Sequence, residues 1–182
     1  MNFCSHCGDR VSLSIPEDDN RERFVCTSSQ CATIHYENPR IITGCLPIYG
    51  DQVLLCRRAI EPRYGLWTIP AGFMENGETT EQGALRESWE EAYATLSIDK
   101  LYALYDLPYI NQVYFIYKAE LLDNNFKSSN ESLEVKLFAE SEIPWNELAF
   151  SVVEKTLKRY FNDRKTGEYL LHTEEIKPRT RS

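Results

Sequence analysis

The chain has no apolar stretch approaching the ~20 residues of a membrane-spanning helix, and its first residues carry no basic or apolar segment of the secretory type. It also lacks an excess of basic residues, since 20 Lys and Arg stand against 28 Asp and Glu for a net charge of -8. Internal repeats and low-complexity segments are absent as well. These absences argue against a membrane protein and against a nucleic-acid backbone as the main partner.

The composition is that of a folded protein, with 42% hydrophobic and 12% aromatic residues in 182. A chain of this length can bury one good core with a small appendage, or two small domains. Metal ions can neutralise an acidic site, so the charge does not count against a phosphorylated small molecule. Six cysteines without a secretion signal predict reduced thiols in the cytoplasm, where clustered cysteines usually bind metal.

Four of these cysteines form two close pairs near the N-terminus. They are Cys4, Cys7, Cys26 and Cys31. Two such pairs resemble a zinc ribbon, because two tight turns can supply the four thiolates of a tetrahedral zinc site, and Gly8 permits the first turn. We predict a structural zinc-ribbon domain over residues 1–37, since so short a segment needs a metal to be stable.

Other cysteines and histidines leave alternatives open. His6 and His35 lie beside the two pairs and could replace a thiolate as zinc ligands. Cys45 and Cys56 lie in apolar, strand-like runs and are expected to be small core residues. Residues 1–37 carry more acidic than basic side chains, which disfavours a ribbon that reads nucleic acid.

Closely spaced carboxylates follow in the middle of the chain. Thr79 and, three residues on, Gln82 form a capping box, which predicts a helix over about residues 79–92. Glu87, Glu90 and Glu91 then share one face of that helix. Oxygen ligands without histidine or thiol suit Mg²⁺ or Mn²⁺; the alternative is a solvated acidic face.

The spacing of this segment closely resembles the Nudix box, G-x5-E-x7-R-E-U-x-E-E-x-G-U, where U is bulky and apolar. The matching positions are Gly72, Glu78, Arg86, Glu87, Glu90 and Glu91. Nudix enzymes use divalent metal to hydrolyse a nucleoside diphosphate linked to another group. The resemblance implies that Glu87, Glu90 and Glu91 bind the metal, that Glu78 supports the site, and that Arg86 orients a glutamate.

Three positions depart from the Nudix pattern. Ser88 replaces an apolar residue, Tyr93 replaces the last glycine, and Ala94 is a small version of the final apolar position. Tyr93 would cost about 1 kcal/mol if the helix keeps a left-handed end. No metal ligand is lost, so the departures affect the helix end and leave the chemistry in place.

The resemblance implies an α/β fold, a Nudix α/β/α sandwich with a mixed sheet, preceded by the small zinc-ribbon domain. The expected parts are a ribbon at 1–37, a Nudix domain at 38–164 and a tail at 165–182. Strands are expected at 41–49, 52–59, 66–72, 101–107, 112–122 and 133–138, and an amphipathic helix at 151–162. Gly50-Asp51 predicts a hairpin, and the tail is expected to be loose or to form one late strand whose only regular part is 168–171.

Hydrolysis also needs a base to take the proton of the attacking water. Glu91 is one candidate and Glu134 is a second, as base or extra metal ligand, because Nudix proteins commonly bring an acid from this later region. A plain surface position is the alternative for Glu134, and Glu131 competes with it for that role.

Four further residues are candidates for substrate binding. Arg57 and Arg58 end a strand leading toward the box and could contact a phosphate, or form exposed ion pairs. Gly72 opens the box itself. Trp67 could stack on a base, although most such aromatic side chains are core; the same holds for Tyr64, Tyr105, Tyr109 and Tyr114.

Residues 65–73, 131–134, 142–144 and 148–150 look like the Nudix branch of plant chloroplast FAD and ADP-ribose pyrophosphatases. NADH pyrophosphatases share the ribbon but carry SQPWPFPxS after the box, where this chain has only DLPY at 106–109. Because Met1 stands three residues from Cys4, we expect no transit peptide and a cytoplasmic bacterial protein.

The sequence therefore predicts metal-dependent hydrolysis of FAD or ADP-ribose to AMP and a phosphorylated product. The alternatives are hydrolysis of NADH, of a nucleoside triphosphate or of capped RNA, and a non-catalytic nucleotide-sensing or protein-binding module. A homodimer is common among relatives. Membrane and nucleic-acid partners are not expected.

Overall fold

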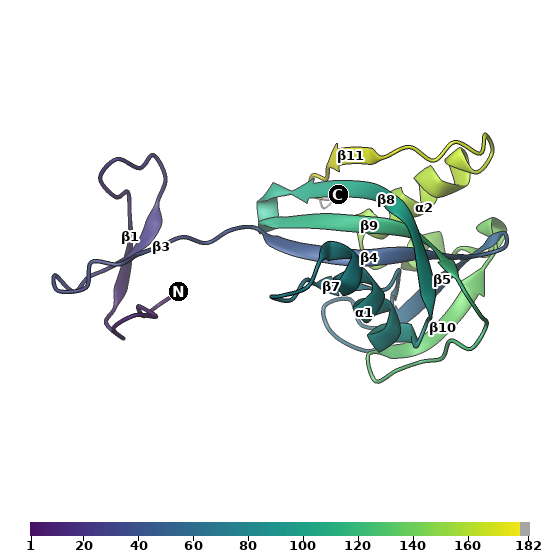
Figure 1. Cartoon of the computed structure of the whole chain (residues 1–182), viewed down its shortest axis with the longest axis horizontal. Coiled ribbons are helices and arrows are strands. Elements are labelled where there is room, and N and C mark those ends of the chain that lie inside the picture. Colours follow the sequence, from purple (N-terminus) through teal and green to yellow (C-terminus); the bar gives the residue numbers. More distant parts are fainter. Residues whose placement is uncertain (179–182) are drawn as a thin grey trace. The chain divides into compact units, whose positions relative to one another are not determined.

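The computed structural model describes residues 1–178, and the chain separates into two compact units, Met1–Asn38 and Pro39–Ser182 (Figure 1). The first unit is a small antiparallel sheet in the order β1-β2-β3. Its strands are β1 (Val11–Ser14), β2 (Arg23–Cys26) and β3 (Ile34–His35). Gly8 has a φ of +83°, which is the left-handed turn that the sequence predicts after the first cysteine pair.

The second unit is built on a mixed sheet in the order β10-β5-β4-β9-β8-β11, with β6 beside β5 and β7 beside β4. The strands are β4 (Arg40–Tyr49), β5 (Gln52–Arg58), β6 (Trp67–Thr68), β7 (Ala71–Phe73), β8 (Leu96–Leu107), β9 (Gln112–Leu121), β10 (Ser132–Phe138) and β11 (His172–Glu175). Strand β4 runs parallel to β9, and β11 runs parallel to β8. The remaining pairs within this sheet are antiparallel.

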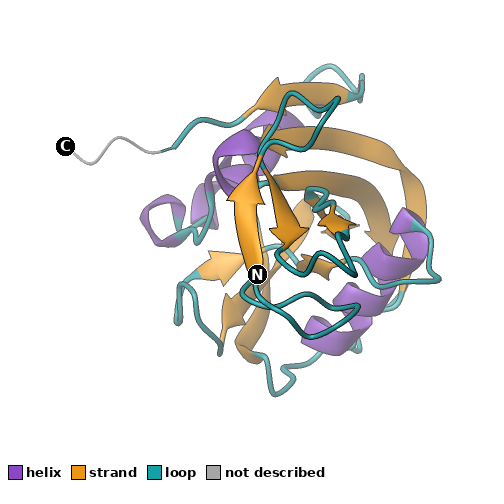
Figure 2. Ribbon diagram, turned by 90° about the vertical axis from the view of Figure 1, so that its left-hand side faces the viewer, coloured by secondary structure: helices purple, strands orange, loops and turns teal. Residues whose placement is uncertain are grey.

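Two helices cover the sheet, α1 (Thr80–Ala92) and α2 (Ser151–Asp163). Figure 2 shows them apart from each other, with strands between them. Each helix has its own apolar core: Ala84 of α1 packs with Cys45 and Cys56, whereas Leu157 of α2 packs with Leu46. The predicted α/β/α sandwich is confirmed. Short 3-10 helices occupy Pro108–Ile110, Glu140–Glu142 and Trp145–Glu147.

Most of the expected elements form where the pattern indicates. The β4–β5 hairpin pairs Tyr49 with Gln52 around Gly50, whose φ is +61°. The strands on either side of residues 108–111 pair as β8 and β9, although β8 begins earlier, at Leu96. The predicted strand at 66–72 is instead two short strands, β6 and β7, which pair with different neighbours.

The last strand lies later than predicted. The regular part was expected at 168–171, but Leu170 and Leu171 are exposed and β11 covers His172–Glu175. The reason lies just beyond it, because Ile176 is fully buried in the α2-side core and Glu174 pairs with α2. None of the helices in the described part of the chain has the length and apolar character needed to cross a membrane.

Candidate active site

Helix α1 begins with the predicted capping box. The Thr79 hydroxyl accepts a hydrogen bond from the Gln82 amide at 3.2 Å, and the Gln82 side chain accepts one from the Thr79 amide at 2.8 Å. This arrangement satisfies two amides that the first turn of a helix leaves free. The carboxylates of the box therefore start from a fixed helix end.

The far end of α1 keeps the left-handed geometry despite the missing glycine. Tyr93 caps the helix with φ 49° and ψ 30°. Its ring meets Trp89 edge to face with centroids 5.5 Å apart, and the Lys127 ammonium lies 4.6 Å from its centre. These contacts offset the strain of a non-glycine residue there. Ser88, another of the three departures, is fully buried and its hydroxyl donates to the Ala84 carbonyl at 2.7 Å.

The Arg86 guanidinium donates hydrogen bonds to three glutamates of the box. Its guanidinium donates to both oxygens of Glu78, at 3.0 and 2.8 Å. A different nitrogen donates to Glu87 at 2.6 Å and to Glu90 at 2.9 Å, and a further bond reaches the Phe73 carbonyl at 3.1 Å. The Arg86 hydrogen bond, followed by one from the Glu75 amide, lowers the pKa of Glu78 to about 2. Arg86 thus orients carboxylates, as the resemblance implies.

Gly72 lies directly against one of these carboxylates. A Cβ at Gly72 would come within 2.3 Å of the Glu87 side chain, so only glycine lets β7 approach α1 this closely. Glu87 is 9% exposed. Burial raises the pKa of Glu87, and the charge of Arg86 opposes that rise.

Glu91 is the most deeply buried carboxylate of the box, at 5% exposure. Burial, and then the negative charge of Glu87, raises its pKa to about 8, while Arg58 opposes this. Its Oε2 atom has no hydrogen-bond partner among the described residues. A cation between two buried carboxylates offsets both the cost of their burial and the repulsion of their charges. The pair Glu87 and Glu91 therefore fits a hard divalent ion such as Mg²⁺ or Mn²⁺.

Glu90 differs from its two neighbours. Half of its side chain is exposed, at 51%, and it is turned toward Arg86. In the arrangement that the structure shows, the helix face presents two buried carboxylates and one solvated one held by the arginine.

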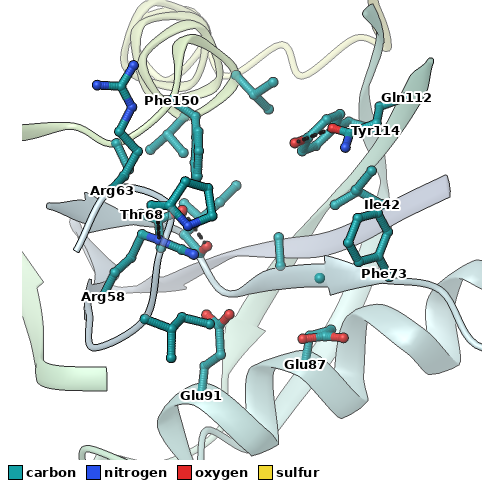
Figure 3. Close-up of a pocket in the computed structure, with 18 of the residues that line it drawn as sticks. Ile42, Arg58, Arg63, Thr68, Phe73, Glu87, Glu91, Gln112, Tyr114 and Phe150 are labelled. Carbon is teal, nitrogen blue, oxygen red and sulfur yellow. Dashed lines mark hydrogen bonds between the residues drawn. The ribbon is translucent and has the colours of Figure 1, made fainter. Parts of the chain in front are cut away.

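A cavity of about 840 Å³ opens above this helix face, within the usual range for small-molecule sites. Figure 3 shows Glu87 and Glu91 projecting from α1 toward it, with Arg58 and Phe150 farther up. Its lining includes Gly72, Glu87, Glu90 and Glu91 together with Glu131. The cavity therefore joins the box to residues distant in the sequence.

Of the two later acids, the structure brings Glu131 to the cavity and leaves Glu134 outside its lining. The charge of Glu131 contributes to the raised pKa values of both Glu87 and Glu91, so it lies near them. Glu134 is exposed on β10, where it pairs in register with Arg57. Geometry thus favours Glu131, which the sequence analysis gave as the competitor of Glu134.

Of the two arginines predicted to bind substrate, Arg58 and Arg57, the structure brings only Arg58 to the cavity. Arg58 lines the cavity at 9% exposure. Its guanidinium donates to the Pro62 carbonyl at 2.9 Å and lies 5.2 Å from the centre of the Phe150 ring. Arg57 donates to the Gly65 carbonyl at 2.8 Å and does not contribute to the lining.

Trp67 is a core residue in this structure. It is 6% exposed and packs edge to face on Phe138 with centroids 4.9 Å apart. It is not part of the cavity lining and belongs instead to the apolar core that includes Val152 and Val153 of α2.

On the far side of the cavity, sequence reasoning named Tyr114 as a residue that could stack on a base, but not its neighbour Gln112. Gln112 and Tyr114 lie beside each other there, away from Glu91 (Figure 3), and the Tyr114 hydroxyl donates to the side-chain oxygen Oε1 of Gln112 at 3.1 Å. Phe73, Phe150 and Arg63 also line the cavity. The period-two alternation of β9 could have indicated that Gln112 and Tyr114 share a face, but not what that face meets.

The four predicted zinc ligands converge in the first unit. The sulfur atoms of Cys4, Cys7, Cys26 and Cys31 all lie within 4.8 Å of one another. A tetrahedral zinc with 2.3 Å bonds places its sulfurs about 3.8 Å apart, and the structure has 3.9 Å for Cys4–Cys31 and 3.4 Å for Cys7–Cys26. Four thiols in this geometry fit zinc.

The two histidines near the cluster take other positions. His35 Nε2 lies 3.3 Å from the Cys4 sulfur, the distance of a hydrogen bond to a ligand. His6 contacts Cys4 through its backbone amide at 3.4 Å. The cluster is therefore complete without either imidazole.

Comparisons with known proteins agree with this geometry. The family model described as "Nudix N-terminal" matches residues 2–37, and the one described as "NUDIX domain" matches residues 38–160. A crystal structure of a NUDIX hydrolase from Nitrosomonas europaea is 53% identical with a TM-score of 0.93, covering 97% of this chain and 99% of that one. The chain belongs to the Nudix hydrolase family, with the family's zinc ribbon in front of the Nudix domain, as the sequence predicts.

Curated relatives are more distant. The NAD-capped RNA hydrolase NudC of Vibrio vulnificus is 26% identical over 90% of this chain and 62% of that protein. The ADP-ribose pyrophosphatase of Methanocaldococcus jannaschii is 27% identical over 69% of this chain and 75% of that protein. The chain thus spans less than two thirds of the length of its NudC relative.

Proposed function

We propose that this chain hydrolyses the pyrophosphate bond of an ADP-containing nucleotide derivative, ADP-ribose or FAD foremost, to AMP and a phosphorylated product. The observation that carries the proposal is one cavity of about 840 Å³ that joins the buried carboxylates Glu87 and Glu91 to the aromatic residues Phe73, Tyr114 and Phe150. A charged floor suits a pyrophosphate with its metal, and aromatic walls suit the two organic groups on either side.

The carboxylates of Glu87, Glu90 and Glu91 would hold Mg²⁺ or Mn²⁺, with Glu78 supporting them through Arg86. A divalent ion bound there supplies charge to screen the phosphate oxygens and lowers the pKa of a bound water. The proton of that water needs an acceptor. We assign this role to Glu131, which lines the cavity, ahead of Glu91, whose carboxylate would hold the metal.

Arg58 is the residue that we assign to a substrate phosphate. It is a buried cation on the cavity wall, and its Nε donates to the Pro62 carbonyl. The terminal nitrogens of an arginine form a fork that matches two phosphate oxygens. The Phe150 ring beside it holds the guanidinium plane in place.

A second candidate substrate is NAD(H), free or as an RNA cap. The NudC relative is named for NAD-capped RNA, and NAD contains the same ADP-ribosyl group as ADP-ribose. The net charge of -8 favours the free dinucleotide, because an RNA chain would be repelled.

The six cysteines form no disulfide in the structure, which is consistent with a cytoplasmic setting.

A substrate panel tests the proposal. Full-length protein with its zinc is incubated with ADP-ribose, FAD, NADH and ATP in Mg²⁺ or Mn²⁺, and AMP is quantified by chromatography. Glu91→Gln, which keeps the side-chain shape, is the matched control. We expect metal-dependent AMP release from ADP-ribose or FAD that the variant loses. Binding of these compounds by calorimetry without turnover would instead identify a sensing module.

A further inference from the structure

A row of three apolar and aromatic side chains crosses neighbouring strands on the far side of the cavity. Phe73 of β7 pairs in register with Ile42 of β4, and Ile42 pairs with Tyr114 of β9. Residues paired across neighbouring strands project from the same face, and all three line the cavity. Phe73 is 49% exposed, even though the Arg40 guanidinium lies 5.4 Å from its ring centre. The row therefore offers a flat apolar surface for a planar ring.

A hydrogen-bonded pair stands at the β9 end of this row. Gln112 lies two residues before Tyr114 on β9, hence on the same face, and it also lines the cavity. The Tyr114 hydroxyl donates to Gln112 Oε1 at 3.1 Å (Figure 3). Burial raises the pKa of Tyr114, so the hydroxyl keeps its proton and remains a donor. Oε1 can still accept a second hydrogen bond, and Nε2 can donate two.

An amide held in this orientation matches the edge of adenine. Adenine presents its N6 amino group, a donor, beside a ring nitrogen that accepts, and a glutamine side chain binds such an edge with two hydrogen bonds. In guanine and hypoxanthine the amino group is replaced by O6, an acceptor, which would face the acceptor Oε1. The arrangement therefore distinguishes a 6-amino purine from a 6-oxo purine.

The row also adjoins the carboxylates proposed to hold metal. Gly72 lies against the Glu87 side chain, and the next residue, Phe73, belongs to the row. Because successive strand residues face opposite sides, β7 has Glu87 on one side and the row on the other. The cavity lining includes both, as Figure 3 shows. One nucleotide can thus place its base on the row and its pyrophosphate beside Glu87.

We propose that Gln112 recognises the adenine base of the substrate, with the N6 amino group donating to Oε1 and Nε2 donating to a ring nitrogen. The base lies on the row of Phe73, Ile42 and Tyr114. Tyr114 is also a positioning residue, since its hydroxyl holds the Gln112 amide in the orientation that selects adenine. The inference rests on the proposed function, hydrolysis of an ADP-containing nucleotide. A site built to hydrogen-bond its ligand rejects one that leaves its polar groups unpaired.

The test compares two substrates that differ only in the base. ADP-ribose carries adenine, and inosine diphosphate ribose carries hypoxanthine. We would measure kcat/KM for both with Mg²⁺, using the full chain with its ribbon zinc, for wild type, Gln112→Leu and Tyr114→Phe. Damage to the fold or to the metal site lowers both values alike, so their ratio isolates recognition of the base. Calorimetric binding of AMP and IMP, which have no pyrophosphate, makes the same comparison without turnover.

Tyr117→Phe is the matched control. Tyr117 lies on the same strand, its hydroxyl forms a 2.6 Å hydrogen bond with the Thr80 hydroxyl, and it lies outside the cavity lining. This variant also loses a hydrogen-bonded hydroxyl from β9, but it should keep the wild-type preference between the two bases.

We expect wild type to prefer ADP-ribose by about tenfold or more, the usual discrimination of a two-bond contact with a base. Gln112→Leu should abolish this preference, chiefly by lowering kcat/KM for ADP-ribose. Tyr114→Phe should reduce it, because the released amide can turn. Equal use of both substrates by wild type, or a full preference retained by Gln112→Leu, would overturn the inference while leaving the proposed hydrolysis intact.

Two further outcomes are separable. If Gln112→Leu does not fold, Gln112→Glu replaces it, since glutamate keeps the size of the side chain and loses the Nε2 donor; an unchanged preference in that variant would overturn the inference. If wild type hydrolyses neither substrate, the proposed function fails, and the AMP and IMP affinities then decide the inference: tighter binding of AMP that Gln112→Leu abolishes supports it, and equal or absent binding overturns it.

Discussion

The guanidinium of Arg86 binds both carboxylate oxygens of Glu78, at 3.0 and 2.8 Å, and so ties the loop before α1 to the second turn of that helix. The same side chain reaches Glu87 at 2.6 Å. One cation therefore sets the spacing between the loop and a proposed metal ligand. The Glu87 carboxylate also packs directly against the backbone of Gly72. It therefore has little room to move even if the arginine is lost.

Arg86→Lys should reduce kcat/KM by about 10–100-fold, the usual effect of losing a side chain that orients metal ligands. Lysine keeps the charge but cannot bind two oxygens of Glu78 in parallel. Steady-state kinetics on the preferred substrate measure the effect, and thermal melting checks the fold. Turnover of the lysine variant within about threefold of wild type would show that charge alone is sufficient at this position.

Glu131→Gln should lower kcat by about 10²-fold or more, since a positioned base typically contributes 10²–10⁴-fold. The change keeps the size of the side chain and removes its ability to accept the proton. Glu134→Gln is the matched control on the same segment, exposed and outside the cavity lining, and should leave kcat unchanged. If the control loses activity and Glu131→Gln does not, the two roles are reversed.

The zinc of the ribbon should be structural and separable from catalysis. The four sulfurs of Cys4, Cys7, Cys26 and Cys31 make a closed ligand set with no position for a substrate or water. We expect one zinc per chain by elemental analysis of untagged protein. Cys26→Ser should clearly lower the melting temperature of the ribbon and lower turnover only slightly. A folded Cys26→Ser protein without activity would mean that the ribbon takes part in the reaction.

The docking of β11 should weaken in acid. Hydrogen bonds from Lys155 and then Arg159 lower the pKa of Glu174 below its usual 4.5. A carboxyl whose folded pKa is lowered stabilises the fold fully above its unfolded pKa and loses that contribution as the pH falls through the folded pKa. Glu174→Gln should therefore cost up to about 1 kcal/mol at neutral pH, and the cost should vanish in acid.

Calorimetric melting curves of wild type and Glu174→Gln between neutral pH and about pH 3 measure this difference, with Glu175→Gln as control because Glu175 is exposed on the same strand. A gap in melting temperature that persists unchanged below the usual pKa of a glutamate would contradict the ion-pair explanation.

Local features of this protein were determined by the sequence alone. The capping box of Thr79 and Gln82 starts α1 because it satisfies amides within one turn. The i, i+3, i+4 spacing puts Glu87, Glu90 and Glu91 on one face whatever surrounds the helix. Gly50 makes the β4–β5 hairpin, and the cysteine spacing defines the ribbon cluster. Each of these depends on residues close together in the chain.

Long-range choices were decided by the tertiary structure. Arg57 and Arg58 are adjacent and chemically identical, yet only Arg58 lines the cavity, because successive strand residues face opposite sides and the layer each side meets is distant in sequence. Glu131 lines the cavity and Glu134 does not, because Glu131 precedes β10 and Glu134 lies within that strand, paired with Arg57. Trp67 enters the core, and Ile176 draws β11 onto β8, because burial depends on which apolar surfaces meet, and only the assembled sheet and helices determine that.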